Sequence, residues 1–532
     1  MDIPARKFIT ILLLTAASLA AAFRTLPPPP LPADTPEALF SAGRAITTIR
    51  AITSSPRLVG SPAFESAKAT VLAQMAALGL ETEVQNTTLD GVRVENVIGR
   101  LQGSTTNDAI LLSAHLDSVA SSPGATDDGS GVAEVLETVR ALRAGPPLRN
   151  TIITLITAPE ENCCYGARAF VSLHPWAKDV RLVIDVDAGG LRGPSILAAS
   201  GPQEGWLVEQ MAPVLPHPVG SSAIEALGSP ATDYTLLYRK AGWMGFDFTL
   251  SWSKRIHSPL DNVADVDLAS LQDQGEHMLA VANHFGNLSL EFPKIPRPVY
   301  FDLLGLIMLY YPSAWAIPIL LVVTLLFAGV LFLGFRRKRL RLRGLAYGAG
   351  ALLLSLLTVP LLLGLLLLVL FSRPSAQLAA QLTGDSLLSN GLRWGSAILT
   401  LAVTWLWYVL FRKTRKVQPD DLDTGTYSIL YLCACGTSLA LPSLSYIFVW
   451  PLLAGLLALS FRLLTDPARA PGWPVFLAEL AAGVLAALLF VPGILMALLS
   501  IDIQMIYLVP VFVAAWLGFL VLPVFDGKNR NY

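Results

Sequence analysis

Residues 109–117 read Ala-Ile-Leu-Leu-Ser-Ala-His-Leu-Asp, an apolar run that ends in a histidine and an aspartate. The first five residues form a short apolar run that is bounded by polar residues, which is typical of a buried strand in a sheet. Two further runs of this kind follow, 152–156 (IITLI) and 182–186 (LVIDV), and the segments between them, 131–143 and 166–173, resemble helices. Strands that alternate with helices predict an α/β domain with a mixed, largely parallel sheet and helices on both faces.

Three segments upstream extend the same domain. Residues 38–54 and 64–79 are predicted to be helices, the second because its apolar residues recur at helical spacing and it ends near Gly79. Residues 92–101 alternate between polar and apolar side chains, as a strand does.

Acidic and imidazole side chains follow the ends of the predicted strands. They are His115 and Asp117 after the first strand, Glu160 and Glu161 after the second and Asp187 after the third, with Asp127 and His257 in loops. Ligands of such sheets bind outside the carboxyl ends of the strands. We therefore expect one site that is assembled from distant parts of the chain.

The charge of this group predicts bound cations. Several carboxylates at one rim repel each other unless positive charge lies between them. Two divalent cations would supply that charge. A mixture of imidazole and carboxylate ligands suits zinc, with manganese and cobalt as alternatives.

Each motif also has an ordinary structural interpretation when it stands alone. A His-x-Asp sequence is equally typical of a satisfied histidine at a strand end, and residues 127–131 (DDGSG) are typical of a turn before a helix. The pair Glu160-Glu161 would usually be solvated, although not at the end of a buried strand. The joint occurrence of the motifs in this order favours a metal site. The sequence His-Glu-x-x-His is absent, which excludes the helical single-zinc motif.

Together the motifs resemble metallopeptidase family 28, the co-catalytic di-zinc aminopeptidases. The resemblance covers roughly residues 40–290 and rests on His115-x-Asp117, residues 127–131, Glu160-Glu161, Asp187 and residues 257–261 (HSPLD). An exported peptidase domain followed by many spans is similar to the membrane-bound endoplasmic-reticulum metallopeptidase (Felix-ina) branch, as are residues 232–234 (TDY) and 245–248 (GFDF). The resemblance implies a three-layer α/β/α zinc-peptidase domain.

The resemblance implies two Zn²⁺ ions per chain and a set of ligands. His115 and Asp187 would hold one zinc, Glu161 and His257 would hold the other, and Asp127 would bridge both. The implied activity is that of an aminopeptidase, which hydrolyses the first peptide bond of a substrate with a free N-terminus by means of a metal-bridging water.

Other residues are assigned by the same resemblance. Glu160 would be the general base, and Asp117 would orient the imidazole of a metal ligand. The sequence departs from the family at Ile256, where some members carry a tyrosine that stabilises the oxyanion. Tyr234 is the candidate for that substrate contact.

The remaining cysteines and histidines of this domain are not assigned to the metals. Cys163 and Cys164 are adjacent and do not form an ordinary unstrained disulfide, and the five ligands above already account for the metals. We expect structural or surface positions for the other histidines, which are His174, His217, His277 and His284.

The second half of the chain has a different composition. Of the 532 residues, 53% are hydrophobic and only 14% are charged, against roughly 25% charged in a typical soluble protein. This composition excludes a disordered, collagen-like or purely soluble protein. A membrane span needs about 20 apolar residues. The apolar runs therefore predict about seven spanning helices, at 314–335, 346–371, 395–411, 426–443, 445–464, 474–499 and 504–524.

Basic residues predict the orientation of these helices. With the N-terminus inside, every basic cluster falls on the same side, as the positive-inside rule requires; the clusters are Arg336–Arg343, Arg412–Lys416, Arg462 with Arg469, and Lys528 with Arg530. The peptidase domain would then be extracytoplasmic (periplasmic, extracellular or lumenal) and the C-terminus cytoplasmic. Because Lys+Arg (38) and Asp+Glu (39) nearly cancel, the net charge predicts no nucleic-acid partner.

The domain boundaries follow from composition. Residues 1–23 are either a signal peptide or a signal anchor, and we favour the anchor because the rest of the chain is membrane-bound. The Pro-rich residues 24–37 predict a stiff spacer that holds the exported domain, 38–292, off the membrane. Residues 293–313 would connect this domain to the membrane domain, 314–532.

Three alternatives to a membrane-anchored zinc exopeptidase are disfavoured. A catalytically inactive peptidase-like scaffold or receptor would not retain all five ligands and the base. A glutaminyl-cyclase-like single-zinc acyltransferase would not need both His115 and Asp187. A transporter would need more ionisable groups within the spans, where Glu479 is the clearest.

Overall fold

The computed structural model describes residues 3–105, 107–162, 164–201, 205–227, 231–253, 255–372, 382, 386–465, 472–500 and 506–525. The chain forms two compact units. Thr25–Tyr311 form one, which we call the α/β unit; Met1–Arg24 and Pro312–Tyr532 form the other, which we call the helical unit.

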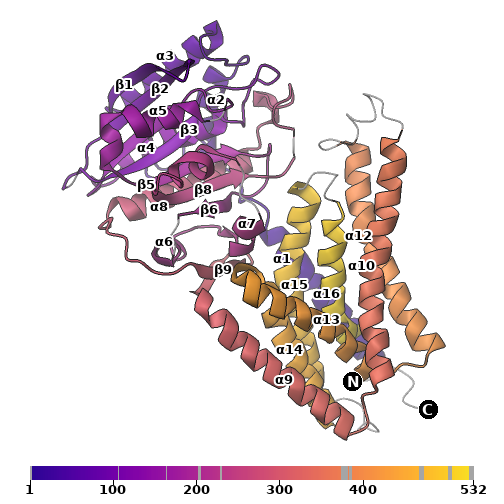
Figure 1. Ribbon diagram of the computed structural model, residues 1–532. Coiled ribbons are helices and arrows are strands. Elements are labelled where there is room, and N and C mark those ends of the chain that lie inside the picture. Colours follow the sequence, from indigo (N-terminus) through magenta and orange to yellow (C-terminus); the bar gives the residue numbers. More distant parts are fainter. Residues whose placement is uncertain are drawn as a thin grey trace. The chain divides into compact units, whose positions relative to one another are not determined.

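The α/β unit is built on an eight-stranded sheet (Figure 1). In spatial order the strands are β1 (Glu81–Leu89), β2 (Val92–Leu101), β4 (Thr151–Thr157), β3 (Ala109–His115), β5 (Val180–Ala188), β8 (Met244–Leu250), β6 (Ile196–Ser200) and β7 (Val219–Gly220). The central strands β4, β3, β5 and β8 are parallel, β1 and β2 join them antiparallel, and β6 pairs antiparallel with β8 and parallel with β7. The mixed, largely parallel sheet predicted from the sequence is confirmed.

The central strands are apolar because both of their faces are covered. Every residue of β3 and β4 is buried. Ile110 and Leu112 pack on one side of the sheet, whereas Leu111 packs on the other. This double burial explains the continuous apolar runs in the sequence.

Helices form the two outer layers. One face packs against α3 (Pro62–Ala77), α4 (Gly129–Arg143), α6 (Gly205–Met211) and α8 (Leu268–Gly286), and the other against α5 (Tyr165–Leu173) and the turns Pro175–Asp179 and Tyr234–Tyr238. Helix α2 (Ala42–Ile52) contacts α3, α4 and α8. The α2 helix begins later than predicted because Ser41 caps it, accepting a hydrogen bond from the backbone N–H of Arg44 at 3.2 Å.

Two segments that were predicted to be linkers are part of this unit. β9 (Pro298–Leu303) and β10 (Ile307–Pro312) form a two-stranded sheet where a connector was expected. In the Pro-rich segment, the backbone N–H of Leu31 donates to Gln272 Oε1 at 3.0 Å and Arg44 donates to the carbonyl of Ala33 at 2.9 Å. From Leu31 onward the segment is therefore docked on the α/β unit, which differs from the free spacer that its prolines predict.

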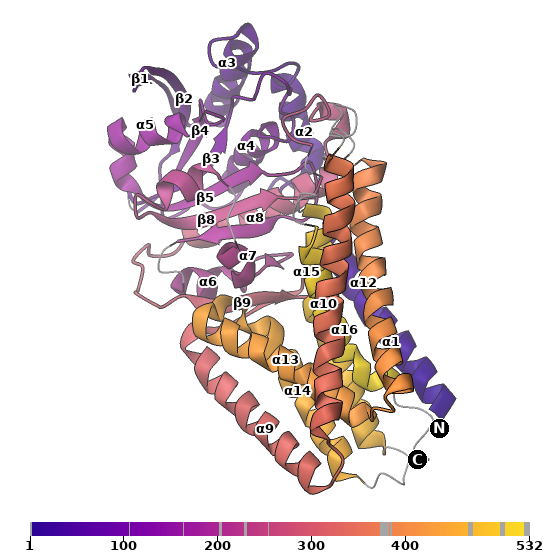
Figure 2. The ribbon, with the colours of Figure 1, turned by 45° about the vertical axis from the view of Figure 1, so that its right-hand side comes forward.

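The helical unit contains the apolar helices. They are α1 (Ile3–Arg24), α9 (Ala316–Arg336), α10 (Leu342–Phe371), α12 (Leu387–Thr414), α13 (Pro419–Ala440), α14 (Ser445–Leu464), α15 (Trp473–Ser500) and α16 (Leu508–Phe525). Helices α10 and α12 are long and run side by side (Figure 2). Among the described residues, five helices are long and apolar enough to cross a membrane: α9, α10, α12, α14 and α15. Helices α13 and α16 also form where spans were predicted, but α13 begins with buried aspartates and the apolar part of α16 is shorter.

Candidate metal centre

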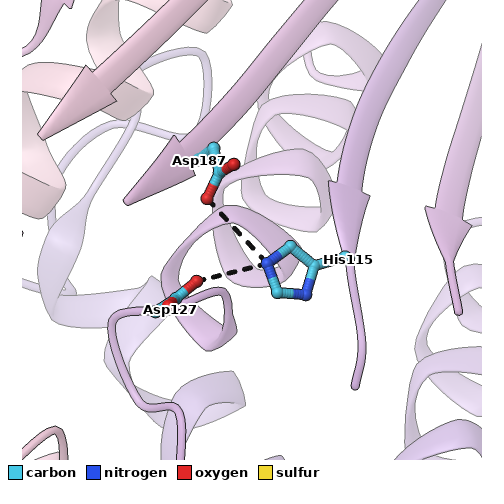
Figure 3. A group of neighbouring side chains, drawn as sticks. All are labelled: His115, Asp127 and Asp187. Carbon is cyan, nitrogen blue, oxygen red and sulfur yellow. Dashed lines mark hydrogen bonds and ion pairs between the residues drawn. The ribbon is translucent and has the colours of Figure 1, made fainter. Parts of the chain in front are cut away.

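His115 is the last residue of β3, and its imidazole faces two carboxylates. Nε2 of His115 lies 3.2 Å from Oδ1 of Asp127 and 3.9 Å from Oδ1 of Asp187, as Figure 3 shows. Asp127 comes from the loop before α4, and Asp187 lies near the end of β5. Nδ1 of His115 donates to the backbone carbonyl of Asp117 at 3.1 Å, which leaves Nε2 to face the carboxylates.

A second group adjoins the first through Asp127. Nε2 of His257, in the loop after β8, lies 3.0 Å from the other oxygen of Asp127 and 3.1 Å from Oε2 of Glu161. One oxygen of Asp127 therefore faces each histidine. The structure thus brings together all five ligands predicted from the sequence.

These distances fit the geometry of zinc coordination. Two ligand atoms that each lie about 2.0–2.1 Å from a tetrahedral zinc are about 3.3 Å apart. In each of the two groups, the ligand atoms all lie within 4.8 Å of one another. The buried Oε1 of Glu161 has no hydrogen-bond partner among the described residues, so one carboxylate oxygen still needs a positive group.

The electrostatics also call for cations. Burial raises the pKa of Asp187 to about 7. Burial lowers the pKa of His115, but its hydrogen bonds with Asp117 and Asp127 outweigh this effect and raise the pKa well above the ordinary value. In the absence of cations the site therefore holds protons that divalent ions would displace.

Backbone hydrogen bonds fix the position of Asp127. The carboxylate of Asp261 accepts from the backbone N–H groups of Thr126 at 2.6 Å and of Asp127 at 3.1 Å. Asp128 caps α4 by accepting from Gly131 N–H at 3.0 Å and also accepts from the backbone N–H of His115 at 3.0 Å. Both residues belong to the recognised motifs, but their supporting roles were not predicted.

Asp117 supports the two glutamates as well as His115. Its carboxylate accepts from the backbone N–H of Glu160 at 2.9 Å and of Glu161 at 3.3 Å. Oε2 of Glu160 lies 4.0 Å from Nε2 of His115, beside the ligand groups, while Oε1 receives the thiol of Cys164 at 3.5 Å. Glu160 is thus adjacent to the candidate metal positions without belonging to either of the two ligand groups.

Two further residues lie at the site: Arg57, which the sequence did not indicate, and Asp233, which belongs to the TDY motif but was given no role. The fully buried Arg57 donates to the carbonyls of Leu116 at 2.5 Å and Gly124 at 2.9 Å and also to the carbonyl of Pro123. It therefore braces the loop between His115 and Asp127 and places a positive charge near the carboxylates. Asp233, which is buried, groups with Glu160 and Cys164, and its Oδ1 has no hydrogen-bond partner among the described residues.

The other candidates belong to neither of the two metal groups. Tyr234, the candidate substrate contact, is fully buried in the core on the α5 side of the sheet. His174 pairs with Glu83, and His217 pairs with Asp273 at 2.9 Å. Cys163 lies outside the described residues.

The region that carries the two ligand groups matches a known protein family. The family model of peptidase family M28 matches residues 96–282, which include all five ligands. These residues belong to peptidase family M28. The resemblance read from the motifs is therefore confirmed, and we call this region the M28 domain.

Curated relatives are similar over the same part of the chain. Endoplasmic reticulum metallopeptidase 1 of Mus musculus is 31% identical over 268 residues, which are 48% of this chain and 29% of that protein. The vacuolar membrane protease of Candida dubliniensis is 34% identical over 218 residues, which are 40% of this chain and 23% of that protein. The match spans less than a third of the length of either relative.

Solved structures were also compared. A zinc aminopeptidase from Bacillus subtilis is 15% identical, with a TM-score of 0.40, and covers 49% of this chain and 99% of its own. A glutaminyl cyclase from Porphyromonas gingivalis is 18% identical, with a TM-score of 0.39, and covers 46% of this chain and 99% of its own.

Proposed function

We propose that the M28 domain is a zinc-dependent aminopeptidase with two metal ions, and that the apolar helices anchor it to a membrane. One observation carries the proposal: the two oxygens of Asp127 face His115 and His257 separately, at 3.2 and 3.0 Å. A single-zinc enzyme, such as a glutaminyl cyclase, would have no need for a carboxylate that joins two ligand groups. An inactive scaffold would have no need to keep the carboxylate of Glu160 within 4.0 Å of the imidazole of His115.

His115 and Asp187 would hold one ion, His257 and Glu161 the other, and Asp127 both. Two divalent cations supply positive charge that makes a water molecule more acidic and polarises a peptide carbonyl. Among the residues of the chain, Glu160 is the proton acceptor, because its carboxylate lies beside the ligand groups and burial raises its pKa to about 9. Cations nearby would lower that value toward neutrality, where a general base works best.

The same site favours substrates with a free N-terminus. Its rim carries Glu160, Glu161 and Asp187, whose side chains are partly exposed, and His257 is about half exposed. Because the ions would neutralise Glu161 and Asp187, the charge left to attract a protonated α-amino group is that of Glu160, and an acylated N-terminus carries no charge to attract. Glu160 would return its proton to the amine that leaves.

The cellular arrangement is part of the proposal. The basic clusters between the helices support an M28 domain outside the cytoplasm and a C-terminus inside. The exported unit would run from Thr25 to Tyr311, beyond the boundaries read from the sequence. Helix α1 packs against α15, which supports its retention as an anchor.

The test is an assay of the purified full-length chain with defined zinc content. We expect about two zinc ions per chain, loss of activity on chelation and restoration by zinc, and release of N-terminal residues from free peptides only. Cleavage confined to N-acetylated peptides would contradict an aminopeptidase. Conversion of N-terminal glutamine to pyroglutamate with one zinc per chain would favour the cyclase, and zinc binding without any turnover would favour the scaffold.

A further inference from the structure

The α/β unit ends in the hairpin of β9 and β10, whose first strand is firmly attached. Val299 and Tyr300 are fully buried. The backbone N–H of Tyr300 donates to Ser222 Oγ at 3.2 Å, and Gly220 N–H donates to Asp302 Oδ1 at 3.4 Å. β9 is therefore a fixed support for β10.

The second strand presents apolar side chains outward. Met308 is buried, but the large residues around it are exposed by 39–59%: Leu306 59%, Ile307 49%, Leu309 39% and Tyr310 44%. Single exposed apolar residues are common on soluble proteins, whereas a contiguous group marks an interaction site. β10 therefore needs an apolar partner.

The turn of the hairpin also indicates that the hairpin needs an apolar partner. Leu304 and Gly305 have φ angles of 58° and 55°, and Leu306 N–H donates to the carbonyl of Leu303 at 3.1 Å. Two central residues with positive φ are typical of a type I′ turn, which favours Asn and Gly. A leucine in this conformation is unfavourable for the backbone, so its presence indicates that an apolar side chain is needed at the tip.

The hairpin is continuous with a membrane-capable helix. No Asp, Glu, Lys, Arg or His occurs from Leu303 to Phe335, which includes β10 and nearly all of α9. Tyr310, Tyr311 and Trp315 lie just before α9, and such residues concentrate at the interface between bilayer and water. Leu306 at the tip precedes Ser313, where the membrane-capable segment begins, by seven residues, so at about 3.3 Å per residue it is at most about 23 Å from the start of the span.

We propose that the β9–β10 hairpin lies in the interfacial layer of the bilayer that α9 enters, with Leu306, Ile307, Leu309 and Tyr310 in contact with lipid. Apolar side chains at this depth are buried among the headgroups and the first acyl carbons. The hairpin is then a second membrane contact of the α/β unit, in addition to the covalent link to the helices. This proposal does not depend on the peptidase activity.

Photo-crosslinking tests the contact. The photoreactive residue benzoylphenylalanine would replace Leu306 or Leu309 in the full-length chain, reconstituted in phosphatidylcholine vesicles. Leu325 of α9, 73% exposed, is the matched positive control, and Leu173 of α5, 55% exposed, is the negative control. We expect phosphatidylcholine adducts, detected by mass spectrometry, at 306, 309 and 325 but not at 173. Adducts at 325 alone, or crosslinks from 306 and 309 only to protein, would overturn the proposal.

A charge substitution gives a second measurement. If β10 contacts lipid, Leu309→Glu should lower the Tm of the vesicle-bound chain by several degrees, whereas Leu173→Glu should leave it unchanged, because charge is costly only in the apolar layer. Equal Tm values for both variants would show that β10 faces water.

Discussion

The carboxylate of Asp117 accepts a hydrogen bond from the backbone N–H of Glu160 at 2.9 Å. This contact joins the loop after β3, which carries the proposed ligand Asp127, to the loop after β4, which carries the proposed base. The backbone carbonyl of Asp117 also accepts a hydrogen bond from Nδ1 of His115. Asp117 therefore orients both His115, a proposed metal ligand, and Glu160, the proposed base.

Removing this carboxylate should impair catalysis more than folding. Asp117→Ala leaves the N–H groups of Glu160 and Glu161 without their acceptor, and loss of such supporting contacts typically costs about 10–100-fold in activity or metal affinity. Asp117→Asn keeps one acceptor oxygen and should lose less. Peptidase kinetics and zinc titration of both variants check this. If Asp117→Ala retained full activity, the contact would have no functional role.

Glu160→Gln should abolish proton transfer while it preserves the metal site. We expect kcat to fall by about 10²–10⁴-fold, the usual contribution of a general base, with zinc content unchanged. Glu81→Gln, at the exposed start of β1, is the matched control and should behave as the wild type. A variant that lost zinc together with activity would identify Glu160 as a ligand instead.

Zinc binding should release protons and strengthen as the pH rises. Hydrogen bonds with Asp127 and Glu161 raise the pKa of His257 to about 10 in the absence of cations. That raised pKa stabilises the metal-free fold below the unfolded value of about 6.5, and this contribution is lost as the pH rises through about 10. Because zinc needs the neutral imidazole, apparent affinity should rise about tenfold per pH unit for each proton displaced.

Calorimetry of the chelator-treated protein in two buffers of different ionisation enthalpy measures these protons directly. At pH 7 we expect net release on zinc binding. An affinity that is independent of pH between 6 and 8 would argue against protonated histidines in the metal-free site.

Arg57 should matter for stability as well as for the site. Arg57→Met removes the guanidinium donors to the carbonyls of Leu116, Pro123 and Gly124, of which Gly124 keeps the backbone N–H of Gly129, and it removes a buried cation near Asp117 and Asp261. Removing one member of a buried ionic group costs about 3–5 kcal/mol. We expect a clearly lower Tm and weaker zinc binding. The exposed Arg50→Met controls for the change in net charge, and an unchanged Tm for Arg57→Met would refute the bracing role.

The helical unit has its own buried ionic group. Arg462 of α14 contacts Asp420 at 2.9 Å and Glu479 of α15 at 3.6 Å and also pairs with Asp423. Arg339, before α10, pairs with Asp420 at 2.6 Å. More ionisable groups are thus buried among these helices than the sequence analysis recognised, and they connect α13, α14 and α15.

Arg462→Leu should destabilise these helices because it removes the cation that Asp423 and Glu479 share, while Asp420 keeps its pair with Arg339. A cost of about 3–5 kcal/mol is expected for such a group. Thermal unfolding in detergent measures it, with the exposed Lys413→Leu of α12 as control. If the two variants unfolded at the same temperature, the ionic group would not hold the helices together.

From local sequence, β2, β3, β4 and β5 were predictable, whereas β1, β6, β7 and the central strand β8 were not. β3, β4 and β5 were predictable because strands covered on both faces are apolar at nearly every residue. β1 (ETEVQNTTL) was missed because an edge strand with an exposed face is largely polar. β9 and β10 were missed, and residues 293–313 were interpreted as a connector, because the turn at Leu304 and Gly305 lacks the Asn-Gly or Asp-Gly signal of a hairpin.

The residues of the site differ in the same way: some could be predicted from local sequence, and others became visible only in the tertiary structure. His115, Glu160 and Asp187 were identifiable because reactive side chains directly followed recognisable strands. Tyr234 was proposed from its motif alone, and its full burial became visible only in the packed core. Arg57 left no signal, since the carbonyls that it binds are 59–67 residues away.

By itself, the sequence determined which residues could bind metal, in what order they follow the strands, and that the second half of the chain is made of apolar helices. These properties depend on residue type and on local periodicity. Only the tertiary structure decided that Asp127 faces two histidines, that Asp117 holds Glu160 in place and that Arg57 braces the loop between the ligands. Such contacts join residues that are distant along the chain, and they form only when the strands have taken their places in the sheet.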